Sequence, residues 1–79
     1  MPPKSLTEIA RSPAGTTRRE LVRALRDAGW SLRREGARHE IWAKAVGRVM
    51  VPRHRGDLAP GTVRTIARDA LSEGESYDR

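Results

Sequence analysis

The chain has 79 residues and a mass of 8.8 kDa, enough for one domain with little chain left over. Hydrophobic residues make up 37% of it, and ten of these are alanine. So small a set of large apolar side chains excludes a large enzyme with a deep buried pocket. Because the chain contains no cysteine, disulfide scaffolds, thiolate metal sites and cysteine nucleophiles are excluded as well.

The charge of the chain points to a polyanionic partner. Sixteen Lys and Arg residues against ten Asp and Glu give a formal net charge of +6, and fourteen of the sixteen are arginine. The segment 33–55 alone holds seven basic and two acidic residues. Arginine binds phosphate through two parallel hydrogen bonds, which lysine cannot do. Composition also allows a simpler interpretation, in which arginine only supplies charge to the surface.

No segment suggests membrane insertion or export. The longest run of large apolar residues is 49–51, far shorter than a membrane span, and no hydrophobic stretch follows the first residues. We therefore expect a cytoplasmic protein that does not associate with membranes.

The two ends of the chain differ in composition from its middle. Residues 1–15 contain three prolines and a glycine, and we expect them to form a flexible N-terminal extension outside the domain. Ser5 and Glu8 could cap one helical turn there, which Pro13 would stop. Residues 73–79 have a net charge of −2 and form an acidic C-terminal tail.

The first helix is expected to begin at Thr17, because Glu20 follows three residues later as in a capping box. Gly29 supplies its C-terminal stop. Apolar residues recur between these points at helical spacing: Leu21, Val22, Leu25 and Ala28.

Three short strands are expected next, at 30–35, 38–45 and 48–51, with Pro52 closing the third. In the second strand, alternation places one set of residues on one face: His39, Ile41 and Ala43. The other set lies on the opposite face: Glu40, Trp42 and Lys44.

A second helix is expected from Pro60, with an apolar stripe formed by Val63, Ile66, Ala67, Ala70 and Leu71. The order is therefore α-β-β-β-α. Short loops favour an antiparallel three-stranded sheet with two helices on one face, which is an α+β fold.

The chain lacks the common patterns of metal and nucleotide sites. Its two histidines, His39 and His54, have no metal-ligand spacing, its acidic residues are not paired, and no glycine-rich phosphate loop is present. We therefore expect no metal and no small-molecule cofactor.

RNA cleavage needs neither a metal nor a small-molecule cofactor, because the RNA 2′-hydroxyl is a nucleophile within the substrate. The reaction requires only a base and a cation. Histidine suits this proton transfer near neutral pH. His39 could be that base or a half-buried strand residue, and His54 could be a turn residue. Likewise Trp30 and Trp42 could stack on bases or simply fill the core.

Four segments in this order resemble the HicA family of toxin ribonucleases, which belong to HicA–HicB toxin–antitoxin modules. The segments are 27–30 (DAGW), 36–42 (GARHEIW), 51–54 (VPRH) and 60–66 (PGTVRTI). The resemblance covers about residues 17–71 and implies a HicA-like domain over 16–72. It also implies a fold similar to double-stranded RNA-binding domains, which agrees with the element order.

The resemblance further implies a metal-independent mRNA endonuclease that a HicB-type antitoxin neutralises. By position, His39 matches the catalytic histidine of the family. Many members have Gly-Ser directly before that histidine, where this chain has Ala37 and Arg38, so Gly36 is the residue available for the turn.

The predicted function is therefore a toxin endoribonuclease with His39 as general base, mRNA as substrate and a HicB-type antitoxin as partner. The side chains expected to bind RNA are Arg38, Lys44, Arg48, Arg53, His54 and Arg55. His54 is also a candidate general acid. The alternative is a non-catalytic RNA-binding module or an inactive toxin homologue.

Overall fold

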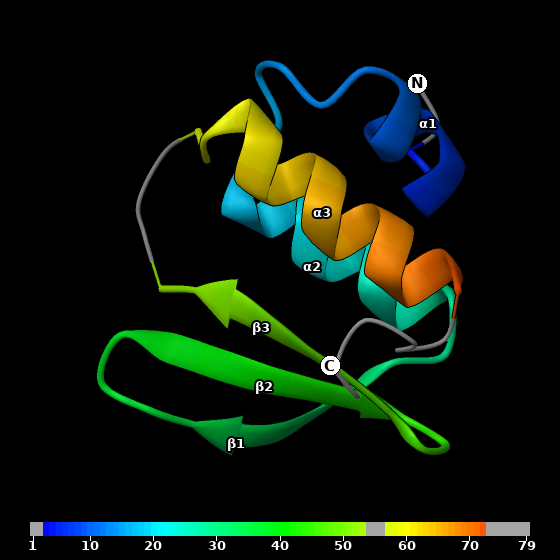
Figure 1. Cartoon of the computed structure of the whole chain (residues 1–79). Helices are drawn as coiled ribbons and strands as arrows, with labels where there is room; N and C mark the ends of the chain where they lie inside the picture. Colours follow the sequence, from blue (N-terminus) through cyan, green and yellow to red (C-terminus); the bar gives the residue numbers. More distant parts are fainter. Residues whose placement is uncertain (1–2, 54–56, 73–79) are drawn as a thin grey trace.

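The computed structural model describes residues 3–53 and 57–72. Three helices lie on one side of a three-stranded sheet, and α3 packs against β3 (Figure 1). The elements in chain order are α1 (Leu6–Arg11), α2 (Arg18–Asp27), β1 (Ser31–Glu35), β2 (His39–Lys44), β3 (Gly47–Pro52) and α3 (Pro60–Leu71). The predicted α+β fold is thus confirmed, with one helix more than expected. The tail 73–79 lies outside the described residues.

The sheet is an antiparallel meander of order β1-β2-β3, as the short loops predicted. His39 pairs with Pro52 at one end of the β2–β3 ladder, and Lys44 pairs with Gly47 at the other. The β1–β2 ladder contains an irregularity between Leu32 and Arg34, which adds a residue to β1. Register therefore places His39 and the end of β3 at the same end of the sheet.

Local sequence signals explain where α2 begins and ends. The Thr17 hydroxyl accepts a hydrogen bond from the Glu20 N–H (3.1 Å), while the Glu20 carboxylate accepts one from the Thr17 N–H (2.9 Å). At the other end Gly29 has a φ of +96°, and the Trp30 N–H donates to the Leu25 carbonyl (2.9 Å). Both predicted boundaries of this helix are confirmed.

The faces of β2 differ as the alternation predicted. Glu40 and Trp42 are buried on the inner face, which we define as the face that the helices cover, whereas His39 is exposed on the outer face. Trp30 and Trp42 are 3% and 1% exposed, so both tryptophans are core residues and do not offer a free ring for base stacking. In α3 the predicted stripe is buried except for Leu71, the last residue of the helix, which is 48% exposed.

The N-terminal segment differs from its expectation. Residues 1–15 were expected to lie outside the domain, but α1 packs mainly against α3, and Leu6 and Ile9 are part of the hydrophobic core. Ser5 and Glu8 form a complete capping box at the start of α1. The short helix forms because two apolar side chains, one turn apart, complete a core that the rest of a small domain leaves open.

Candidate functional site

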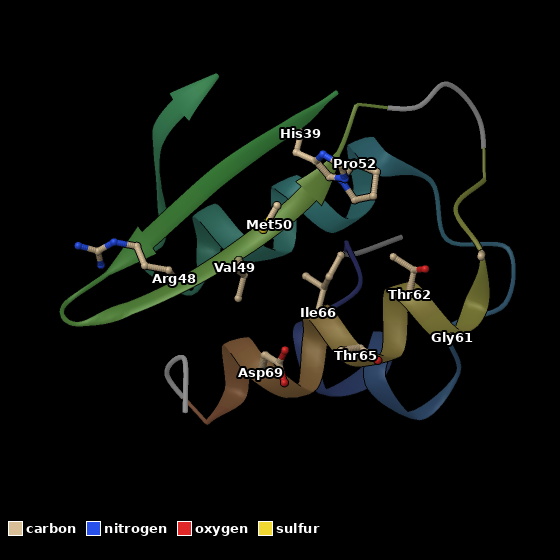
Figure 2. A pocket seen from close by; sticks show the side chains of 11 residues that line it. His39, Arg48, Val49, Met50, Pro52, Gly61, Thr62, Thr65, Ile66 and Asp69 are labelled. Carbon is tan, nitrogen blue, oxygen red and sulfur yellow. The ribbon is translucent and has the colours of Figure 1, made fainter. Parts of the chain in front are cut away.

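His39 is the first residue of β2 and lies at one end of a groove between β3 and α3 (Figure 2). The groove has a volume of about 740 Å³, within the usual range of ligand sites. His39 stands beside Pro52, its partner in the β2–β3 ladder, and its side chain is exposed. A ligand in the groove could therefore reach the imidazole.

The lining of the groove is mixed in chemistry. Val49 of β3 points toward Ile66 of α3 (Figure 2), and both side chains are buried, whereas Met50 points to the other side of β3 and is 47% exposed. Thr62 and Thr65 add hydroxyl groups along α3. The exposed Met50 suits a partner that buries apolar surface, while the hydroxyl groups can donate or accept hydrogen bonds.

The turn that precedes His39 is held by three hydrogen bonds. The Gly36 N–H donates to the His39 carbonyl (2.8 Å), and the Arg53 N–H donates to the Arg38 carbonyl (2.8 Å). The Arg53 side chain donates through Nη1 to the Gly36 carbonyl (3.0 Å). A Cβ atom at Gly36 would lie 3.0 Å from the His39 carbonyl oxygen, so a glycine permits this close approach.

Two of the expected RNA-binding cations lie next to His39. Arg38 directly precedes it, and Arg53 is joined to the same turn by the hydrogen bonds just described. Both side chains are exposed. Each guanidinium can therefore meet a phosphate close to the imidazole.

The other two described cations are engaged elsewhere. Lys44 lies at the opposite end of β2, where its Nζ donates to the Ala28 carbonyl (2.7 Å) at the end of α2. Arg48 lines the other end of the groove, but its guanidinium donates to the Gly47 (2.7 Å) and Ala45 (3.1 Å) carbonyls of the β2–β3 turn and extends away from His39 (Figure 2). The structure thus does not bring Lys44 or Arg48 together with His39. His54 and Arg55 lie outside the described residues.

Glu40, a buried carboxylate directly after His39, was not among the predicted site residues. Glu40 is 6% exposed, forms an ion pair with Arg18 of α2, and accepts a hydrogen bond from the Trp42 indole N–H (3.2 Å). A charged residue on the strand face that also holds a tryptophan was the available signal, since a buried charge needs a partner. The pair fixes the start of α2 to the strand that begins with His39.

Within residues 3–53 and 57–72, no group of three or more acidic or histidine side chains is placed to hold a metal ion. In the same part of the chain, no helix combines the length and the apolar character needed to cross a membrane.

Comparison with known proteins identifies the family. A family model described as "HicA toxin of bacterial toxin-antitoxin" matches residues 18–71, which contain α2, the whole sheet and α3. No curated protein and no solved structure gave a significant match. Since the match covers more than half of the chain and includes the groove with His39, the chain belongs to the HicA toxin family of bacterial toxin–antitoxin systems.

Proposed function

We propose that this toxin is a metal-independent endoribonuclease that cleaves mRNA, with His39 as its general base. The observation that supports this most is the exposed imidazole at the end of an open groove, with Arg38 and Arg53 on the adjoining turn. Cleavage at a 2′-hydroxyl requires a base and a cation, and this turn offers two cations beside the imidazole. A substrate of this kind also places the protein in the cytoplasm.

In the proposed reaction, His39 takes the proton of the 2′-hydroxyl as its oxygen attacks the adjacent phosphorus. The bond from phosphorus to the 5′-oxygen breaks, and that oxygen takes a proton from water. The products are a 2′,3′-cyclic phosphate and a 5′-hydroxyl, and His39 later returns its proton to solvent. Arg38 and Arg53 would stabilise the negative charge that develops on the phosphoryl oxygens.

As partner we propose a HicB-type antitoxin that neutralises the toxin by covering His39. The exposed apolar side chain of Met50, which lines the groove, supports a protein partner at this place. The cores of protein interfaces are depleted in charge and enriched in apolar side chains, and methionine is common there. Binding of this kind would bury the imidazole and exclude RNA at the same time.

The test is the variant His39→Ala, assayed with pure protein and RNA in EDTA. The unaltered protein should cleave, and the variant should lose at least about 10²-fold in rate, the usual contribution of a positioned acid–base group. Its melting temperature should change little because the side chain is exposed. A folded variant with full activity would exclude His39 as the base. Binding without cleavage by the unaltered protein would instead identify a non-catalytic RNA-binding module.

A further inference from the structure

Helix α2 presents a strongly basic surface that lies outside the groove of His39. Four arginines share this surface and line a depression of about 530 Å³ together with Val22 and Asp27. We define the basic face of α2 by these four arginines: Arg18, Arg19, Arg23 and Arg26. Of the two acidic residues in α2, Glu20 is used in the capping box at the helix start.

The chemistry of this surface favours a polyanion over a protein partner. Its only apolar lining residue is Val22, which is buried at 9% exposure, so no apolar side chain is available to form the centre of a protein interface. The groove of His39 differs in that one of its apolar lining side chains, that of Met50, is exposed. The two surfaces therefore suit two different kinds of ligand.

Two of the four arginines are fixed in place by the sheet. Arg18 is paired with Glu40, and the Arg26 guanidinium carbon lies 5.2 Å from the centre of the Trp42 ring. Arg19 and Arg23 are exposed, and the nearest acidic partner of Arg23 is Asp27 at 3.9 Å, an exposed pair of little strength. Because Glu40 already compensates the charge of Arg18, the positive charge available to phosphates on this face comes from the exposed Arg19, Arg23 and Arg26.

The basic face begins at the end of the sheet that holds His39. Arg18 contacts Glu40, the residue directly after His39, and the Leu58 N–H donates to the Thr16 carbonyl (3.1 Å) just before α2. From there the arginines extend along α2, and Arg19 and Arg26 are about 10 Å apart along the helix axis at 1.5 Å per residue. An RNA strand bound at His39 could thus continue past the β1–β2 turn onto α2.

We propose that the basic face of α2 binds phosphates of the RNA on one side of the cleaved bond, so that the toxin contacts nucleotides beyond the bond that it cuts. The choice of RNA as the ligand of this face rests on the proposed function. The binding of flanking phosphates is thus assigned to α2 instead of Lys44 and Arg48, whose side chains bond to backbone carbonyls.

The test uses two double variants of the full chain. Arg19→Gln with Arg23→Gln removes two exposed charges of the basic face without touching Arg18, which pairs with Glu40, or Arg26, which lies over Trp42. The control, Arg64→Gln with Arg68→Gln, makes the same change at the same spacing on α3, at two exposed positions that do not line the groove. Glutamine keeps the helix propensity close to that of arginine, so circular dichroism should show both variants folded.

Two RNAs are compared, a short one that spans only the cleaved bond and its neighbours and a long one that extends well beyond it. At ~0.1 M salt, the loss of two phosphate contacts should weaken binding of long RNA about 20-fold and reduce the salt slope by about 1.4. The weaker binding should give the α2 variant a higher KM on long RNA with an unchanged kcat. On short RNA, both KM and kcat should change little. The α3 control should bind like the unaltered protein.

Equal binding by the α2 variant and the α3 control would overturn the proposal, as would equal losses on short and long RNA. A variant that binds RNA normally but loses the antitoxin would also overturn it and make α2 a protein interface. Failure of the proposed function looks different. In that case the unaltered protein leaves both RNAs intact. A loss of RNA binding in the α2 variant, with none in the α3 control, would still support phosphate binding by α2.

Discussion

Arg18, the first residue of α2, forms an ion pair with Glu40, the second residue of β2. The same carboxylate oxygen accepts the hydrogen bond of the Trp42 indole N–H. A helix and a strand that are far apart in the sequence are thus joined one residue away from His39. Since Glu40 is buried, the strength of this contact depends on both partners being present.

Removal of one partner should therefore be costly. Glu40→Ala leaves a half-buried guanidinium and a buried indole N–H without their acceptor, and we expect a loss of about 3–5 kcal/mol in the free energy of unfolding. Chemical denaturation of Glu40→Ala, Arg18→Ala and the double variant measures the coupling between the two residues. Asp27→Ala serves as the control, since its exposed pair with Arg23 should contribute less than about 1 kcal/mol. Strictly additive losses would show that the pair is not coupled.

The packing of α1 predicts that the N-terminus cannot be removed without cost. Ile9 is 0% exposed, and Ile9→Ala should reduce the free energy of unfolding by about 2–5 kcal/mol because it leaves a cavity next to α3. Deletion of residues 1–14 removes Ile9 together with the rest of α1, so it should lower the melting temperature at least as much as Ile9→Ala does. The exposed Thr7 on the same helix provides the matched control, Thr7→Ala, which should change little. An unchanged melting temperature after the deletion would mean that α1 does not stabilise the domain.

Glu20 should make the stability of the domain dependent on pH. The backbone N–H of Thr17, which donates to its carboxylate, holds the pKa of Glu20 below its ordinary value of 4.5. The folded protein therefore holds this proton less tightly than the unfolded chain does. The stabilisation is complete above about pH 4.5 and is lost as the pH falls through the lowered pKa. Melting curves of Glu20→Gln and the unaltered protein should differ most near neutral pH and converge in acid. A difference that is constant with pH would contradict this.

Two glycines should respond to alanine in opposite ways. Gly36→Ala would place a Cβ 3.0 Å from the His39 carbonyl oxygen, so the turn must shift, and both the melting temperature and RNA cleavage should fall. Gly61, the second residue of α3, has open space for a Cβ, so Gly61→Ala should stabilise the domain by about 0.4–1 kcal/mol through the lower freedom of the unfolded chain. The two melting temperatures, measured side by side, check the prediction. A Gly36→Ala protein as stable and active as the parent would show that the turn tolerates a side chain.

Local signals in the sequence were sufficient for most of the fold. The capping box at Thr17, the positive φ at Gly29 and the alternation in β2 all depend on residues close together in the chain. The same kind of signal was present at Ser5 and Glu8. Pro13 and Gly15 led to the interpretation of that segment as an extension, because the sequence alone does not show where Leu6 and Ile9 would be buried.

The candidate site was less accessible to prediction. Strand alternation predicts that His39 is exposed, and Arg38 is its neighbour in the sequence. The groove, however, forms only because α3 packs against β3, a contact between distant parts of the chain. The partners of Lys44 and Arg48 are backbone carbonyls of other elements or of the turn, which no pattern in the sequence specifies. The ion pair of Arg18 with Glu40 is also a tertiary contact between residues 22 apart.

Helix α1 precedes the segment that matches the HicA family, yet it packs against α3, the helix that forms one wall of the groove. Brief detachment of α1 would expose one side of α3 to water and let the amide hydrogens of that helix exchange with solvent. The same opening would give proteases access to the chain, and its frequency would then set the lifetime of the toxin in the cell. Substitutions at Leu6 or Ile9 would thus change how long the toxin persists while its chemistry stays the same.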